Sequence, residues 1–312
     1  MPIPLIIDTD MANDDWMAIL YLLQSPAVAV QAIAVAAAGE AHRGPGIRTA
    51  LRLLALAGRP DIPVAGGRKK PLRGRHAFPL IWRLSMDLRL GLSLPKARAR
   101  PDSRSAVALL TELIMAGPDK LSLLALGPLT NLAEAVLACP ALVDQVEMVY
   151  IMGGAVHVPG NLQAPGVKLD NQTAEWNIYV DPYAAEVVFQ SGLPITLVPL
   201  DATNQTPITL DFYRRCQARR ETPAAEFVYR ILHRLKSFIA SGEFYFWDPL
   251  AAVVATHPDI ATVEQQPLTV IQAAGPECGR TAISQTGRPI QVCLQADQAR
   301  FEAIFWDTLN NH

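Results

Sequence analysis

The chain carries a dense cluster of carboxylates close to its N-terminus. Asp8, Asp10, Asp14 and Asp15 fall within eight residues, directly after the apolar residues 4–7. Carboxylates crowded at the end of a buried strand raise one another's pKa unless a hard metal ion binds their oxygens and keeps them ionised. The cluster therefore predicts a cation site, and Ca²⁺ is the ion that this set of oxygen ligands favours.

The local pattern places this cluster at the edge of a sheet. The apolar run predicts a strand that ends at Asp8, and apolar residues at helical spacing over 16–23 predict a helix that opens near Asp14. In open α/β sheets, ligands bind at the carboxyl ends of the strands. Asp14 or Asp15 could instead only cap the helix, but capping leaves Asp8 and Asp10 unexplained.

Two further segments could supply the oxygen ligands that the acidic cluster lacks. Ca²⁺ binds about six to eight oxygens, so other loops at the same edge should contribute. In the turn at 126–131, the backbone carbonyl of Leu126 can point inward ahead of Gly127. The second candidate is Asp248, which precedes Pro249. A competing interpretation makes Asp248 the N-cap of a helix with the proline at its first position.

A third group of polar residues has the composition of a sugar-binding site. Asn161, Glu175 and Asn177 follow a strand-like run that ends at 152–154. Two carboxamides and a carboxylate offer paired donors and acceptors to vicinal hydroxyl groups. These residues could instead be turn formers in loops, and Asp181 is expected to cap a helix.

Strand-like and helix-like segments alternate along the chain, which is typical of βαβ units. This alternation predicts an α/β fold with a mostly parallel central sheet flanked by helices, and we expect one domain over residues 1–312. The expected strands are 28–37, 61–65, 121–126, 146–152 and 195–200. The expected helices cover 47–56, 106–115 and 182–190, and others begin near 129 and 248.

Residues 68–104 break this alternation and are strongly basic. Long irregular segments in folded domains are often functional loops. A basic loop could attract phosphate or RNA, but the simpler interpretation is a solvated loop that compensates the acidic pocket at long range. We expect the apolar insert 78–82, which ends in Trp82, to pack over another apolar group rather than to stay in solvent.

The composition excludes several classes of function. A formal net charge of −2 and a pI of about 6.3 argue against a general binder of nucleic acids or membrane surfaces. No apolar run reaches the length of a membrane span. The four cysteines are widely spaced and form no Cys-x-x-Cys pair, so we expect buried thiols in a reducing compartment. With no secretory signal ahead of the first strand, we expect a cytoplasmic protein.

Five motifs, taken in order, resemble the calcium-dependent nucleoside hydrolases of the inosine-uridine type. The resemblance covers almost the whole chain. The matching motifs are Asp8-Thr9-Asp10 with Asp14-Asp15, Gly127-Pro128-Leu129-Thr130-Asn131, Met152-Gly153-Gly154, Glu175-Trp176-Asn177 and Asp248-Pro249. The resemblance implies a nucleoside hydrolase-like fold with a Rossmann-like core, a small nucleoside as substrate, a bound Ca²⁺, and a homodimer or homotetramer.

The resemblance also implies a role for each matched residue. Asp10 would be the general base for a metal-bound water that attacks the anomeric carbon of the ribose. The expected calcium ligands are Asp10, Asp15, Asp248 and the carbonyl of Leu126. The expected substrate contacts are Asp14, Met152, Asn161, Glu175 and Asn177. Carboxylates among these contacts would also stabilise an oxocarbenium-like sugar.

The sequence departs from the family pattern at two points. Met11-Ala12 replaces the usual Pro-Gly, so the acidic loop must turn without its customary glycine. Trp247 stands where many members carry a histidine that serves as a candidate acid for the leaving base. A tryptophan cannot protonate a purine.

In the purine-preferring branch of the family, two tryptophans sandwich the base, and stacking makes its ring nitrogen easier to protonate. Trp247 and Trp82 resemble this pair, although both could simply be core residues. Glu40 falls where the family has an amide or acid near the ligand. We expect Glu40 to hydrogen-bond a purine edge, with a solvated turn as the alternative.

The sequence thus predicts hydrolysis of the N-glycosidic bond of ribonucleosides, with purines preferred. A phosphatase of the haloacid dehalogenase type also places Asp-x-Asp after its first strand. That pattern requires Thr or Val where this chain has Ala12, and it requires later Lys and Asp-Asp motifs that are not clear here. The other alternative is a nucleoside- or sugar-binding protein that has lost catalysis.

Overall fold

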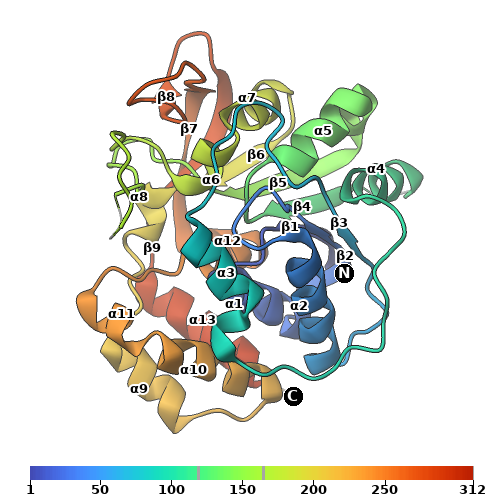
Figure 1. The fold of residues 1–312 in the computed structure, drawn as a ribbon, viewed down its shortest axis with the longest axis vertical. Coiled ribbons are helices and arrows are strands. Elements are labelled where there is room, and N and C mark those ends of the chain that lie inside the picture. Colours follow the sequence, from blue (N-terminus) through green and yellow to red (C-terminus); the bar gives the residue numbers. More distant parts are fainter. Residues whose placement is uncertain (118–119, 164–165, 312) are drawn as a thin grey trace.

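A nine-stranded sheet runs through the centre of the molecule (Figure 1). The computed structural model describes residues 1–117, 120–163 and 166–311. Along the sheet, the strands follow the order β3-β2-β1-β4-β5-β6-β9-β7-β8. In chain order, the strands are β1 (Ile3–Thr9), β2 (Val28–Val35), β3 (Val64–Gly66), β4 (Leu121–Ala125), β5 (Val146–Met152), β6 (Ile195–Val198), β7 (Ala261–Val270), β8 (Thr281–Ile283) and β9 (Arg288–Ala296).

The sheet is mostly parallel, as predicted. Strands β1 to β6 pair in parallel, and β9 adds to β6 in the same sense. Strand β7 pairs antiparallel with both β9 and β8. The order of the first six strands is that of the Rossmann fold, and it reverses between β1 and β4.

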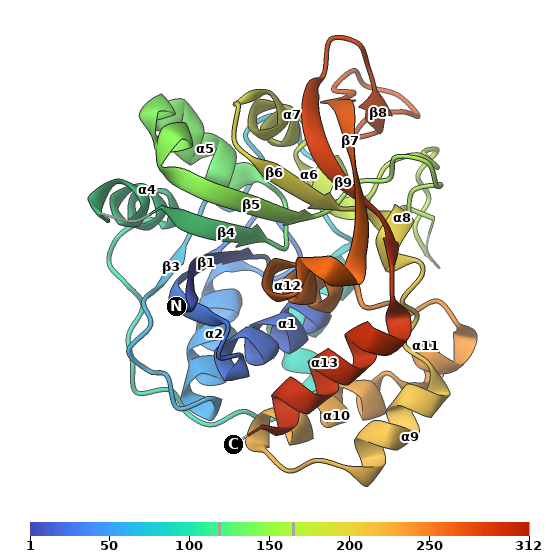
Figure 2. The ribbon, with the colours of Figure 1, turned by 180° about the vertical axis from the view of Figure 1, so that it is seen from behind.

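Each face of the sheet carries its own apolar core, because parallel strands bury side chains on both sides. In β1, Leu5 and Ile7 pack into one core and Ile6 into the other. Helices from both ends of the chain cover one face, and helices from the middle cover the other (Figure 2). The first set is α1 (Asn13–Gln24), α2 (Arg43–Leu56), α12 (Trp247–Thr256) and α13 (Gln298–Asn310). The second set is α4 (Ala106–Ala116), α5 (Thr130–Ala138) and α7 (Pro182–Gln190).

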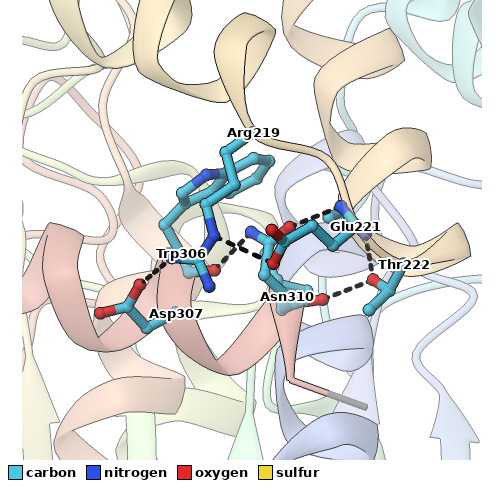
Figure 3. A network of polar contacts seen from close by, with 8 residues as sticks. Arg219, Glu221, Thr222, Trp306, Asp307 and Asn310 are labelled. Carbon is cyan, nitrogen blue, oxygen red and sulfur yellow. Dashed lines mark hydrogen bonds and ion pairs between the residues drawn. The ribbon is translucent and has the colours of Figure 1, made fainter.

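The C-terminal helix α13 is tied to the turn between α9 (Leu210–Ala218) and α10 (Pro223–Arg234) by a polar network (Figure 3). Thr222 Oγ1 accepts a hydrogen bond from the N–H of Ala225 at 3.0 Å and donates one to the carbonyl of Leu309 at 2.5 Å. Asn310 Oδ1 accepts the N–H of Glu221 at 2.8 Å. The helices not yet introduced are α3 (Leu80–Asp87), α6 (Trp176–Val180), α8 (Leu200–Thr203) and α11 (Lys236–Ser241).

The basic segment 68–104 is only partly irregular. It contains α3 and a single 3₁₀ turn at Arg89–Gly91, so the expectation of an irregular segment is wrong for residues 80–87. The apolar residues of α3 recur at helical spacing, but the helix is only eight residues long and no side chain caps its start, so the local signals for it are weak. Within the described ranges, every helix is too short or too polar to cross a membrane.

Candidate active site

The candidate site lies where the strand order reverses. Strands β1 and β4 are parallel neighbours, so the loops at their carboxyl ends leave the sheet side by side. The N–H of Leu126 donates to the carbonyl of Asp8 at 2.7 Å and joins the two loops. From α5, the helix that follows β4, Asn131 Nδ2 donates to Asp8 Oδ1 at 2.8 Å. Both predicted segments, the acidic loop after β1 and the turn at 126–131, therefore lie at the expected edge of the sheet.

The acidic loop turns through Met11. Its φ of 64° lies in the left-handed region, which glycine adopts more easily than other residues. The cost is roughly 1–2 kcal/mol, and the surrounding contacts hold the conformation. The N–H of Met11 donates to Thr9 Oγ1 at 3.0 Å, and Trp16 Nε1 donates to the carbonyl of Met11 at 2.9 Å. This explains how the loop turns without the customary glycine.

Carboxylates from two helices meet above this loop. Asp14 and Asp15 in α1 and Asp248 in α12 each offer an oxygen, and these oxygens lie within 4.8 Å of one another. Asp15 Oδ2 accepts the N–H of Ala12 at 2.9 Å, and the Thr9 hydroxyl donates to its other oxygen.

Asp248 is not the N-cap of its helix. The helix α12 begins at Trp247 after Phe246, so Asp248 is its second residue, and the capping interpretation is wrong. Asp181, by contrast, caps α7 as predicted, because its side chain accepts the N–H of Ala184 at 3.2 Å.

The electrostatics of the cluster fit a hard cation. Burial raises the pKa of Asp10 to about 6, and burial together with the charge of Asp10 raises the pKa of Asp14 to about 7. Burial and the neighbouring carboxylates raise the pKa values of Asp15 and Asp248 well above their usual range. A divalent cation would reverse this trend by favouring the charged forms. All the donors are oxygens, which suits Ca²⁺.

The segment 36–41 closes around the side chain of Asp10. The N–H of Glu40 donates to Asp10 Oδ2 at 3.0 Å. Gly39 lies so close that a Cβ there would stand 2.3 Å from both Asp10 Cβ and Oδ2. Burial and the charge of Asp10 raise the pKa of Glu40 well above its usual range. Glu40 is half-buried in a bend beside Asp10, so its contact with a purine edge stays a prediction.

The predicted sugar-binding residues form a second polar group. The Glu175 carboxylate accepts N–H groups from Asn177 at 2.9 Å and from Gly154 at 3.0 Å. Asn177 Nδ2 donates to the carbonyls of Leu126 and Met152, each at 3.2 Å. This amide therefore joins the ends of β4 and β5. Burial raises the pKa of Glu175 to about 7, and the charge of Asp10 contributes.

Asn161 reaches this group through the backbone. Its Oδ1 accepts the N–H of Trp176 at 3.1 Å, next to Glu175. The structure therefore brings Leu126, Met152 and Asn177 into direct contact, and it places Asn161 and Glu175 on either side of the start of α6. The hydrogen bonds of Glu175 and Asn177 satisfy polar atoms that would otherwise be buried without a partner.

The two tryptophans pack in separate aromatic groups. Trp82 in α3 stands edge-on to Trp176, with ring centroids 5.4 Å apart and an interplanar angle of 64°. Trp247 lies 5.8 Å from Phe244 and 5.9 Å from Tyr245, measured between ring centroids. Both Trp82 and Trp247 are half-buried, unlike the fully buried Trp16 of the core. Among the described residues, no ring contact joins the two.

Sequence analysis missed two residues that shape the site, Thr9 and Arg83. Thr9 holds Asp15 and the turn at Met11. It lies inside the Asp-Thr-Asp motif, so its place between two buried acids was the available signal. Arg83 donates from α3 to backbone carbonyls of the segment 36–41. In the sequence, it is one basic residue in a basic segment, and nothing distinguishes it from its neighbours.

Comparisons with known proteins point to one family. A family model described as inosine-uridine preferring nucleoside hydrolase matches residues 5–303. A pyrimidine-specific ribonucleoside hydrolase RihA from Klebsiella pneumoniae is 39% identical over 211 residues, which cover 67% of this chain and 63% of that relative. The match thus spans slightly under two thirds of the length of that relative.

Two solved structures resemble the whole chain. The plant nucleoside hydrolase PpNRh1 is 28% identical with a TM-score of 0.89, and the likeness covers 100% of both chains. A purine-preferring ribonucleoside hydrolase from Gardnerella vaginalis is 26% identical with a TM-score of 0.83, and 98% of each chain is covered.

Proposed function

Because the family model covers nearly its whole length, the chain belongs to the inosine-uridine preferring nucleoside hydrolase family, and we propose that it hydrolyses ribonucleosides to free base and ribose. The observation that carries this proposal is the cluster of Asp14, Asp15 and Asp248 beside Asp10, at the point where the strand order reverses. A haloacid dehalogenase-type phosphatase has no support from the comparisons.

We propose Ca²⁺ as the bound ion. Asp10, Asp15 and Asp248 would hold it together with the carbonyl of Leu126. That carbonyl accepts one hydrogen bond from Asn177, which leaves its second lone pair for a cation. When bound, Ca²⁺ lowers the pKa of a coordinated water and so favours attack near neutral pH.

Asp10 is the proposed general base. The N–H of Glu40 fixes its Oδ2, and the N–H of Ala12 lies 3.3 Å from its Oδ1. The carboxylate is therefore held in one orientation, which a proton acceptor needs if it is to meet the attacking water in a fixed geometry. Asp10 takes the proton from the water as the oxygen attacks the anomeric carbon.

The second polar group is the proposed ribose site. Asp14, Met152, Asn161, Glu175 and Asn177 would contact the sugar and its hydroxyl groups. The glycosidic bond breaks through a sugar with oxocarbenium character. The negative charges of Asp14 and Glu175 would stabilise that positive charge in a water-poor pocket.

Trp82 and Trp247 are the proposed contacts of the base, and Glu40 would hydrogen-bond a purine edge. Stacking favours the larger ring system, so we propose a preference for purines. The names of similar proteins do not favour one class: the Klebsiella relative is called pyrimidine-specific and the Gardnerella structure purine-preferring. Trp82 and Trp247 are each only half-buried, which leaves part of each ring open to stack on a base.

Three expectations about the whole protein remain proposals. We propose that residues 1–312 form one domain, that the protein is cytoplasmic, and that it assembles as a homodimer or homotetramer. The four cysteines are free; three are buried, as predicted, and Cys139 is half-buried. Light scattering would test the assembly.

Replacement of Asp10 by Asn tests the proposed base. The amide oxygen can still accept the N–H of Glu40, but it cannot take a proton from water. General base catalysis contributes about 10²–10⁴-fold, so kcat for inosine should fall by about that factor. Ribose affinity, measured by calorimetry with Ca²⁺ present, should stay close to that of the wild type. An unchanged kcat would remove Asp10 from this role, and tight nucleoside binding without turnover by the wild type would make the protein a binding protein.

A further inference from the structure

Helix α3 presents apolar side chains to solvent. At about 100° per residue, its exposed apolar residues fall on one face of the helix. These residues, with exposed fractions from 43% to 69%, are Leu80, Ile81, Leu84 and, directly after the helix, Leu88. Arg83 and Asp87 lie one turn apart on another face. The apolar contacts that hold α3 come from two other residues, the buried Met86 and Trp82, which packs edge-on to Trp176.

Polar contacts tie α3 to the rest of the protein. Asp87 accepts the N–H of His42 at 2.9 Å, and its other oxygen lies 2.6 Å from His42 Nδ1. Arg83 donates from a terminal guanidinium nitrogen to the carbonyl of Ala37 at 3.2 Å and from Nε to that of Glu40 at 3.4 Å. Arg83 and Asp87 thus hold the helix in place through polar contacts, and Arg83 does so by hydrogen bonds to the backbone of the segment 36–41.

The same segment holds Asp10 from its other side. The N–H of Glu40 donates to Asp10 Oδ2, and the N–H of Ala41 donates to the Asp10 carbonyl at 2.9 Å. One peptide segment therefore lies between the guanidinium of Arg83 and the carboxylate of Asp10. A displacement of Glu40 on one side moves the hydrogen-bond donor on the other.

We propose that Arg83 is a positioning residue for the reaction: it holds segment 36–41 against Asp10 and couples the helix that carries Trp82 to the carboxylate. This inference rests on the proposed function. Because Trp82 is the adjacent residue in α3, a base that orders Trp82 also orders Arg83, and through it the N–H of Glu40.

Charge supports the same assignment. Burial lowers the pKa of Arg83, whereas the carboxylates of Asp10, Asp87 and Glu40 raise it. The guanidinium therefore stays charged close to Asp10. A lysine would keep the charge, but it offers a single ammonium where the planar fork of arginine spans two carbonyls.

Arg83→Ala and Arg83→Lys test the proposal against the matched control Arg234→Ala. Arg234 also donates from Nε to a backbone carbonyl, that of Leu90 at 3.1 Å, and it holds the turn after α3 without reaching segment 36–41. Each variant is assayed with inosine and with p-nitrophenyl riboside, whose leaving group needs no protonation. Unfolding curves verify that each variant is folded.

We expect Arg83→Ala to lower kcat by about 10²-fold, the cost of a catalytic group misplaced by roughly 1 Å. The loss should be the same for both substrates, with KM nearly unchanged, because Asp10 serves both reactions. Arg83→Lys should recover only part of the rate, and guanidinium ion at tens of millimolar should partly rescue Arg83→Ala. Arg234→Ala should keep the wild-type kcat.

A loss confined to inosine would overturn the proposal, because Arg83 would then act at the leaving base. A loss found only in KM would overturn it too, since it would make Arg83 a substrate contact. If Arg83→Ala does not fold, Arg83→Lys becomes the test. A wild-type kcat in that variant would show that the guanidinium, which spans two carbonyls, is not needed, and it would overturn the proposal. If the wild type hydrolyses neither substrate, both the proposed function and the role of Arg83 are refuted. Normal wild-type turnover with an unaffected Arg83→Ala refutes the inference alone.

Discussion

Gly39→Ala should impair catalysis by displacing Asp10 without changing any catalytic group. The φ of Gly39 is not in the left-handed region, so its backbone accommodates alanine. The new Cβ, however, would stand 2.3 Å from Asp10 Cβ and Oδ2 and 2.7 Å from Cγ. Ordinary contact between such atoms is at about 3.5–4.0 Å. Asp10 or the segment 36–41 must therefore move by about 1 Å.

A shift of this size has two expected costs. Overpacking of a close-packed site destabilises a protein by about 1–3 kcal/mol. Misplacement of the proposed base by about 1 Å lowers kcat by roughly 10²-fold. The loss should fall on kcat rather than on KM, because the ribose contacts from Glu175 and Asn177 come from other elements.

Steady-state kinetics with inosine and urea unfolding measure both effects. Gly44→Ala is the matched control: Gly44 lies in the first turn of α2, and its added Cβ would meet only the flexible end of Arg48 at 3.3 Å. That variant should keep the wild-type kcat, and its stability should not rise, because Pro45 disfavours a helical conformation for a preceding residue that carries a Cβ. A folded Gly39→Ala with the wild-type kcat would refute the claim that the position of Asp10 limits the rate.

Two further predictions concern the leaving base and the fold. Trp247→Ala should lower kcat/KM for purine ribosides by a few-fold to about tenfold more than for p-nitrophenyl riboside, because stacking contributes about 0.5–1.5 kcal/mol; equal losses on both substrates would refute activation by stacking. Thr222→Ala should destabilise the protein by about 1–2 kcal/mol, because it removes the cap of α10 and the bond to Leu309. Urea unfolding should show this loss of stability, and kcat should be unchanged. Thr222→Ser should restore most of the lost stability. A wild-type midpoint of urea unfolding in Thr222→Ala would contradict the capping role.

The sequence predicts the parts of the fold in which local pattern and burial agree. The apolar run before Asp8 forms β1, and Asp181 caps α7. Both could be predicted because an apolar run and a helix cap are recognised from residues that are neighbours in the sequence. Asp14 and Asp15 meet Asp248, as the family resemblance implies, although Asp248 lies in α12 and does not follow a strand.

Other parts depend on contacts between distant segments. Asp248 has the local sequence of a helix cap, and its actual place as the second residue of α12, beside Asp14 and Asp15 of α1, depends on how the two helices pack. Helix α3 is eight residues long and begins without a side-chain cap, so its local sequence signals are weak. Arg83 acts on a segment more than forty residues away in the chain, which no local pattern reveals.

The most direct test of the account is release of free base and ribose from inosine, adenosine, guanosine, uridine and cytidine, with and without a calcium chelator. We expect turnover that is faster for the purine ribosides, stops with the chelator and returns when Ca²⁺ is added in excess. Turnover that persists in the chelator would contradict the metal site. Uridine as the best substrate would refute the tryptophan sandwich, and nucleoside binding without turnover would contradict the central claim of hydrolysis.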